Sequence, residues 1–219
     1  MKKKRLPGRP AEKQGTNLDE ILSTVTRCFA KNGYGGVSIS LLAKEAGIAD
    51  SLLHYHFGNK EAIWKKAVAH TGNKIIAEME QLIPLIKHLD GIEQLKILNK
   101  KLLYYSASYP EFQQIVIQEV FSKSARSKWL IDNALDSVFT YYDEIIVQEQ
   151  QNGQLKNIPL PNVYSFIIGA LVTLYSRSYL IEERYGINPF DPEQQEIHAN
   201  AMNDLIFNGL LKVASDDSK

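Results

Sequence analysis

Side chains that can bind phosphates crowd into one short stretch of the chain, residues 49–60. Tyr55 offers a hydroxyl and Lys60 an ammonium group, and both suit phosphate oxygens. If Lys60 begins a helix, the free N–H groups and the helix dipole at that end add to its charge. His54 and His56 are two residues apart, so on a helix they point about 200° apart and make a poor metal pair. We therefore expect the histidines to contact DNA or to pack between helices, and we predict no metal and no cofactor.

The elements that must position these side chains read as two short helices around a tight turn. Ser38 is a good N-cap for the first helix, and Gly47 supplies the left-handed conformation that ends it. Asp50 or Ser51 opens the second helix, and we expect Asp50 either to cap it or to accept from a cytosine amino group. Its inner side carries apolar residues four apart, Leu53 and Phe57. This layout is typical of a helix-turn-helix, whose second helix lies in the DNA major groove.

A first helix precedes this pair and braces it. Asn17 and Glu20 form a capping-box-like start, and apolar residues follow at helical spacing until Gly33. Gly33-Tyr-Gly-Gly36 is read as a turn, because it follows a helix and lacks a downstream Gly-Lys-Ser/Thr. Lone Cys28 lies on the apolar stripe and is read as a core residue.

Three segments together resemble the N-terminal domain of the tetracycline-repressor (TetR) family. They are Phe29-Ala-Lys-Asn-Gly-Tyr-Gly-Gly-Val-Ser38, Leu42-Ala-Lys-Glu-Ala-Gly-Ile48 and Leu53-His-Tyr-His-Phe-Gly-Asn-Lys-Glu-Ala62. The resemblance covers roughly residues 17–65. It implies a dimeric transcriptional repressor that a small ligand releases from DNA. The DNA-contacting positions that it implies are Ser38, Ser40, Lys44, Ala49, Asp50, Ser51, Leu52, His54, Tyr55, His56 and Lys60.

The chain also departs from the family pattern. A Gly or Pro commonly stands where Ser51 is, a Thr or Ser at Leu52, and a Tyr at His54. Asp50 places a negative charge where DNA approaches. These differences bear on the operator sequence and leave the fold unaffected.

Charge is divided between the two ends of the chain, although the net charge of the 219 residues is zero. Residues 1–60 hold 10 Lys and Arg against 5 Asp and Glu, and residues 61–219 hold 15 against 20. Such a split predicts a phosphate-binding end and a body that does not bind DNA. Residues 1–16 read as a basic arm, in which Arg9 either enters a minor groove or belongs to a solvated tail. With no secretory signal, one cysteine and no apolar run of about 20 residues, a cytoplasmic protein without a membrane partner is expected.

Residues 61–219 predict further helices and no strand. Helices are expected from Glu61 to a break or kink at Pro84, from Asp90, from Pro110 through Phe121, from Ser127 to Gln151, from Pro161 to Glu183, and from Asp191-Pro192 to about Val213. The fold predicted is all-α, with an N-terminal three-helix helix-turn-helix DNA-binding domain and a C-terminal helical ligand-binding and dimerisation domain. Its parts are the arm 1–16, the DNA-binding domain 17–62 and the effector-binding and dimerisation domain 63–215.

The last two predicted helices carry more apolar surface than a monomer hides. Paired with their copies across a two-fold axis they would form a four-helix interface, and the alternative is an internal two-helix core. The residues predicted at that interface are Phe166, Ala170, Leu174, Ala201, Leu205 and Gly209.

The other helices are expected to enclose a largely apolar cavity for a small effector of unknown identity. Glu119 and Arg177 lie in apolar stretches and are predicted to pair with each other or with a polar ligand. The residues predicted to bind the ligand are Tyr104, Tyr105, Glu119, Trp129, Tyr142, Tyr175 and Arg177.

Three other functions are weighed against a ligand-released repressor. An enzyme is disfavoured, because no nucleophile-elbow, zinc or nucleotide-loop motif is present. A TetR-type activator and a ligand-independent architectural DNA-binding protein remain alternatives. The expected partners are thus an operator in double-stranded DNA, a small effector and a second copy of the chain.

Overall fold

The computed structural model describes residues 18–211, and no β-strand forms within them, as predicted. An isolated bridge joins Leu155 and Leu211. The elements are α1 (Leu18–Asn32), α2 (Ile39–Glu45), α3 (Asp50–Phe57), α4 (Lys60–Ile86), α5 (Gly91–Ser108), α6 (Pro110–Val120), α7 (Ala125–Leu130), the π-helical turn η1 (Ile131–Leu135), α8 (Asp136–Gln151), α9 (Leu160–Ser176), α10 (Ser178–Tyr185) and α11 (Pro192–Leu210).

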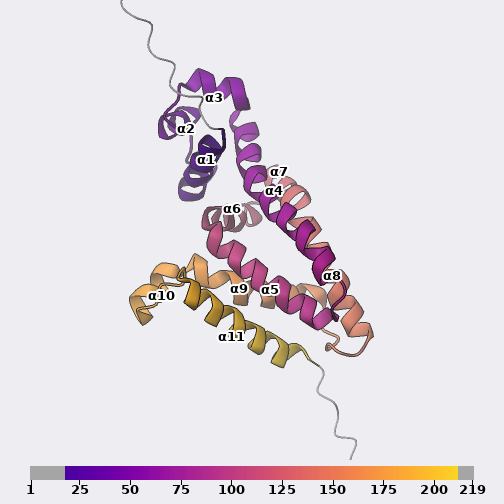
Figure 1. The fold of residues 1–219 in the computed structure, drawn as a ribbon. Helices are drawn as coiled ribbons and strands as arrows, with labels where there is room; N and C mark the ends of the chain where they lie inside the picture. The colour runs from indigo at the N-terminus through magenta and orange to yellow at the C-terminus, as the bar shows by residue number, and fades with distance from the viewer. Residues whose placement is uncertain (1–17, 212–219) are drawn as a thin grey trace, which may run out of the picture.

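The N-terminal three-helix unit, which consists of α1, α2 and α3, lies at one end of the molecule (Figure 1). The hydroxyl of Ser38 caps α2 by accepting from the N–H of Leu41 at 3.1 Å. Gly47 follows α2 with φ +67, a conformation that glycine adopts without a Cβ clash. The predicted helix-turn-helix is therefore confirmed. Its buried apolar side chains are Ile21, Val25, Phe29, Val37, Leu42, Leu53 and Phe57.

Two predictions about this unit have other outcomes. Asp50 does not cap α3, because the N-cap is Ala49 and Asp50 is the first helical residue. Its carboxylate instead accepts a hydrogen bond from the hydroxyl of Ser40 on α2. Asn17, the predicted cap of α1, lies outside the described residues.

The long helix α4 connects the three-helix unit to the rest of the chain (Figure 1). Asn59 caps it and accepts from the N–H of Ala62 at 2.9 Å. The predicted end at Pro84 is wrong, because α4 continues to the buried Ile86. Pro84 lies in the last turn, where its missing N–H removes one helical hydrogen bond. The predicted domain boundary after residue 62 falls in the first turn of this helix.

The helix predicted over 127–151 is interrupted. Ser124 caps α7 and forms a capping box with Ser127, and the π-helical turn η1 then separates α7 from α8. Ala134 of η1 lies against Gly72 of α4, where a Cβ on the glycine would stand 3.3 Å from the Cβ of Ala134. Because Gly72 has no side chain, α4 can pack closely against the π-helical turn η1.

The apolar helix predicted from Pro161 to Glu183 is bent. It divides at Arg177 into α9 and α10, whose axes differ by 69°. No single helix in residues 18–211 has the length and apolar composition to cross a membrane. Together, α9 and α10 have that length and composition, but only as this bent pair.

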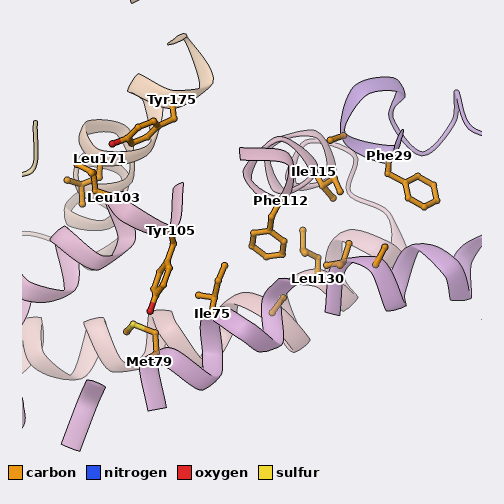
Figure 2. Close-up of a cluster of buried hydrophobic side chains, with 14 of the residues drawn as sticks. Phe29, Ile75, Met79, Leu103, Tyr105, Phe112, Ile115, Leu130, Leu171 and Tyr175 are labelled. Atoms are coloured by element: carbon orange, nitrogen blue, oxygen red, sulfur yellow. The ribbon is translucent and has the colours of Figure 1, made fainter. Parts of the chain in front are cut away.

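The C-terminal helices share a core in which α5 packs on α8, α9 and α11. Buried Asn99 of α5 donates to Asn203 of α11 at 3.0 Å and accepts from Tyr142 of α8 at 3.3 Å, so its polar atoms are satisfied. Figure 2 shows Ile75, Met79, Tyr105 and Phe112 facing one another where α4, α5 and α6 meet.

Replacing Leu53 tests the packing of α3. Leu53→Ala empties a fully buried site, so the free energy of unfolding should fall by about 2–5 kcal/mol. The adjacent Leu52 is 36% exposed, and Leu52→Ala should change the free energy of unfolding by less than about 0.5 kcal/mol. Urea denaturation followed by circular dichroism measures both variants. Equal losses would contradict the burial of one face of α3.

Candidate functional site

The outer face of α3 is the first candidate site. Leu53 and Phe57 hold the helix against α1 and α2, and the side chains between them point to solvent. Tyr55 is 83% exposed. The predicted DNA-contacting residues that the structure leaves exposed are Ser38, Ser40, Lys44, Ala49, Asp50, Ser51, Leu52, His54, Tyr55 and His56. Arg9 lies outside the described residues.

Lys60 stands at the N-terminus of α4, just after α3 ends. Its Nζ lies 4.4 Å from the centre of the Tyr34 ring, an arrangement that holds the ammonium group by a cation–π interaction. Lys66, a residue that the sequence analysis did not single out, donates from Nζ to the backbone carbonyl of His56 at 3.0 Å. It thereby satisfies a free carbonyl at the C-terminus of α3. No spacing in the sequence indicates this contact, because it depends on the angle between α3 and α4.

The histidines of α3 do not form a metal site. Within residues 18–211 no group of three or more His, Cys, Asp or Glu side chains is arranged to hold a metal ion. The α3 face can therefore act through hydrogen bonds, apolar contacts and charge.

The second candidate site is a cavity of about 650 Å³ between α4, α5, α6, η1, α8 and α9. Its wall contains no charged residue and no histidine. Its rim includes Ile117, Val120, Phe121 and Ile131, of which Phe121 is 81% exposed. The lining residues are Ile75, Met79, Leu98, Leu102, Tyr105, Phe112, Gln113, Val116, Ile117, Val120, Phe121, Ile131, Ala134, Leu135, Val138, Phe139, Tyr142, Tyr164, Ser165, Ile168, Gly169 and Val172.

Two of the predicted ligand-binding residues, Tyr105 and Tyr142, line this cavity. The hydroxyl of Tyr105 is buried without a hydrogen-bond partner in the described part of the chain. Burial, and then nearby Glu78, raises the pKa of Tyr105, and burial also raises the pKa of Tyr142. Burial raises the pKa of Tyr164, another lining residue, to about 12. All three phenols therefore remain neutral at physiological pH.

Three other predicted ligand-binding rings lie elsewhere. Tyr104 donates to Glu196 Oε2 at 2.6 Å, and burial with this hydrogen bond raises the pKa of Tyr104 to about 12. Trp129 packs edge-on against Trp64, with ring centres 5.8 Å apart. Tyr175 packs against Phe190 and His198. Each ring faces a neighbouring element and not the cavity.

The predicted pairing of Glu119 with Arg177 is wrong. Glu119 is 5% exposed and accepts from Arg126 Nε at 3.2 Å, whereas Arg177 is exposed at the bend between α9 and α10. Neither lines the cavity. The physical reason is the bend, which turns Arg177 toward solvent and removes the need for a buried partner.

The predicted dimer residues on α9 and α11 are exposed or half-buried. Phe166 is 48% exposed and Leu205 is 61% exposed, and Ala201 and Gly209 are also exposed. Ala170 and Leu174 are half-buried. The sequence analysis missed Ile197, which is 53% exposed. Its position four residues before Ala201 could have identified it.

Comparison with known proteins agrees with this arrangement. Residues 21–67 match the model of a family described as bacterial regulatory proteins, tetR family. The fatty acid metabolism regulator protein of Bacillus subtilis is 24% identical over 137 residues, which cover 63% of this chain and 70% of that protein. The biofilm operon icaADBC HTH-type negative transcriptional regulator IcaR of Staphylococcus epidermidis is 33% identical over 58 residues, 26% of this chain and 31% of IcaR.

A solved structure extends the match to the whole described fold. The transcriptional regulator FadR from Bacillus subtilis, in complex with stearoyl-CoA, superimposes with a TM-score of 0.65 and 20% identity. The superposition covers 88% of this chain and 99% of that one. At this identity the likeness shows a shared fold. The matching region, the all-α fold and the named regulators agree with one another: residues 21–67 carry the DNA-binding domain of the tetR family of bacterial regulatory proteins, and the chain shares the fold of such regulators.

Proposed function

We propose that the protein is a transcriptional repressor that binds a pseudo-palindromic operator as a dimer and is released when a small apolar molecule enters its cavity. The observation that carries this proposal is one chain with both an exposed α3 face and a cavity of about 650 Å³, joined through α4. IcaR, which is 33% identical over 58 residues, is named a negative regulator, and this supports repression over activation. An architectural DNA-binding protein would have no use for the cavity.

DNA binding is assigned to α3 and the start of α4. The residues proposed to contact the operator are the exposed positions of α3, together with Ser38, Ser40 and Lys44 of the preceding helix. Lys60 is proposed to bind a phosphate, since it combines its own charge with the free N–H groups of the α4 N-terminus. Tyr55 is proposed to reach either a phosphate or a base edge.

Dimerisation is assigned to the outward face of α9 and α11. Exposed Phe166, Ile197 and Leu205 form an apolar face that a monomer leaves in water. A two-fold interface would cover it and would hold two α3 helices about 34–36 Å apart, the spacing of successive major grooves.

The effector is inferred to be apolar with few hydrogen-bonding groups. An uncharged wall disfavours a charged group inside the cavity, because no opposite charge offsets its desolvation. The unpartnered hydroxyl of Tyr105 can donate to one acceptor of the ligand. FadR in its complex with stearoyl-CoA sets the precedent for an acyl chain in this fold.

Release is proposed to follow from a shift between two arrangements of the dimer. A ligand that favours one arrangement of the helix beginning after Asn59 changes the separation of the two α3 helices. To reduce occupancy strongly, the ligand must favour the released arrangement by a few kcal/mol, about 5.5 kcal/mol for a full reversal of the populations.

Selection from random duplexes tests DNA recognition. The protein should enrich a pseudo-palindrome, and Lys60→Ala should weaken binding by a similar factor on every sequence and reduce the salt slope by about 1. Lys128→Ala is the control, since Lys128 is a 78% exposed cation on α7. Anisotropy titrations at several salt concentrations measure both. An unchanged slope for Lys60→Ala would contradict the phosphate contact.

Titration of the selected complex with dodecanoate tests release. Its apolar chain fits the uncharged wall and its carboxylate can stay in water beside exposed Phe121, so we expect dodecanoate to release the duplex at concentrations that leave choline without effect. Choline is the control, because it is a small charged molecule without an apolar chain. Equal affinity of dodecanoate for free and DNA-bound protein would remove the mechanism.

A charge on the outward face of α11 tests dimerisation. Leu205→Asp should yield a species of about half the wild-type mass in light scattering, because a pair of buried carboxylates opposes association. Leu85→Asp is the control, since Leu85 is 69% exposed on α4, away from α9 and α11. A Leu205→Asp variant that keeps the dimer mass would show that this face is not the interface.

A further inference from the structure

The segment from the end of α6 to α7 faces the cavity on one side and the three-helix unit on the other. Ile117, Val120 and Phe121 line the cavity. Gln118, between them, donates from Nε2 to the backbone carbonyl of Ala30 on α1 at 2.7 Å. If the cavity wall moves at Ile117 and Val120, Gln118 moves with it, and Gln118 is hydrogen-bonded to α1.

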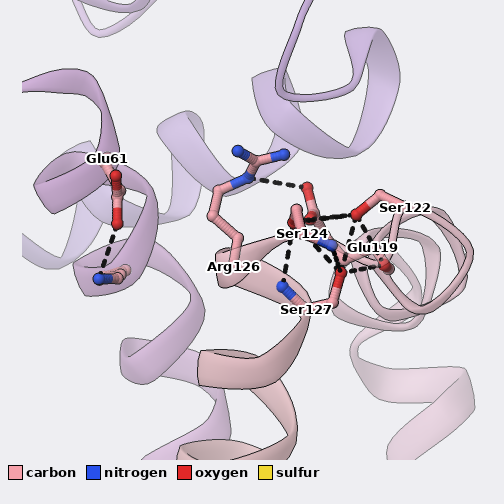
Figure 3. A network of polar contacts seen from close by, with 7 residues as sticks. Glu61, Glu119, Ser122, Ser124, Arg126 and Ser127 are labelled. Atoms are coloured by element: carbon pink, nitrogen blue, oxygen red, sulfur yellow. Dashed lines mark hydrogen bonds and ion pairs between the residues drawn. The ribbon is translucent and has the colours of Figure 1, made fainter.

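Glu119, next in the sequence, is buried and held by a dense set of polar contacts (Figure 3). The hydroxyls of Ser122 and Ser124 donate to Oε2 at 3.2 and 3.3 Å, and Ser127 donates to the backbone carbonyl of Glu119 at 2.6 Å. The guanidinium group of Arg126 donates from Nε to Oε1 at 3.2 Å and supplies the opposite charge. This set fixes the position of Arg126 relative to the end of α6.

The same guanidinium group lies on aromatic rings of the DNA-binding part of the chain. Its central carbon stands 3.7 Å from the centre of the Tyr34 ring and 6.0 Å from that of Trp64. Tyr34 belongs to the turn between α1 and α2, and Trp64 to α4. Arg126 thus lies on the turn that leads into α2 and on α4, and α3 packs on both of these helices.

Tyr34 extends this chain of contacts to the DNA-facing surface. Its ring stacks on Phe29 of α1, with centres 6.0 Å apart and planes 10° apart. The ammonium group of Lys60 lies 4.4 Å from the same ring. A shift of Arg126 therefore acts on the ring that supports a proposed phosphate-binding cation.

We propose that Arg126 is a positioning residue that couples the state of the cavity to the orientation of the three-helix unit. It joins Glu119, the sequence neighbour of cavity-lining Val120, to Tyr34 in the turn between α1 and α2 and to Trp64 of α4. The inference rests on the proposed function in one respect, namely that the cavity is where the effector binds. A planar guanidinium group suits this role, because it pairs with a carboxylate in its plane and stacks on a ring through its face.

A built-in occupant tests the coupling without a known effector. Gly169 lines the cavity, and a Cβ there would meet no atom within 4 Å, so Gly169→Leu adds bulk to the cavity without a clash at its first atom. Hydrogen exchange of the amides in residues 33–40 is measured in the DNA-free protein with and without Gly169→Leu. In the wild-type background we expect the exchange rates to change by about five-fold or more.

The same comparison in an Arg126 background decides the role of this residue. Arg126→Met with Glu119→Gln leaves no unpaired buried charge, and in this double variant the response to Gly169→Leu should fall to less than about two-fold. Lys128→Met is the control. Lys128 lies two residues after Arg126 in the sequence, and its ion-pair partner is Asp132. It should retain the wild-type response.

The outcomes separate this inference from the proposed function. A response that persists in the Arg126 double variant, or that is absent from the wild-type background, overturns the coupling role. If the Arg126 double variant were only less stable, exchange would rise both with and without Gly169→Leu, and the change caused by Gly169→Leu would persist. This comparison therefore distinguishes a coupling role of Arg126 from a merely structural one. Failure of every protein to bind duplex DNA would overturn the proposed function while the exchange result stands.

Discussion

The structure depends on one helix that belongs to two parts of the molecule. Its N-terminus, capped by Asn59, carries Lys60 beside α3, and its middle carries Ile75 and Met79 in the cavity wall. Because α4 is continuous over Lys60–Ile86, one hydrogen-bonded helix spans from the residues beside α3 to those in the cavity wall. The close approach of Gly72 and Ala134 holds this helix against η1, so the cavity and the helix are not independent.

Two kinds of contact join the halves of the molecule, and they differ in how they respond to strain. Apolar packing between α4 and η1 resists separation but has no preferred direction. The contacts of Arg126 with Glu119 and Tyr34 are directional, since a guanidinium group pairs in its plane and stacks through its face. The first kind keeps the halves together, and the second fixes how they are turned. The release proposed above would draw on both kinds of contact.

The three-helix unit could be predicted from the sequence because capping and turn residues act on their near neighbours in the chain. Ser38, Gly47 and Asn59 act within one turn of their own positions, so their roles follow from residue type and spacing. The residues that line the cavity were harder to predict, because adjacent aromatic rings on one helix face different neighbouring helices. Tyr105 of α5 faces the cavity while Tyr104, about 100° around the helix, faces α11. Arg126 and Lys66 escaped prediction because their partners lie far away in the sequence. Of the two roles predicted for Asp50, the cap is wrong, because its carboxylate accepts from the hydroxyl of Ser40, ten residues earlier in the sequence.

The uncharged wall of the cavity has a consequence for an effector of the kind proposed. The ionisable lining residues are Tyr105, Tyr142 and Tyr164, and burial raises their pKa values further above a phenol's ordinary value of about 10. No carboxylate, imidazole or amine is among the residues that line the cavity. The lining therefore keeps one protonation state between mildly acidic and mildly alkaline surroundings. The proposed effector would meet the same wall across that range, so a pH dependence of its release from DNA would have to come from groups elsewhere in the protein.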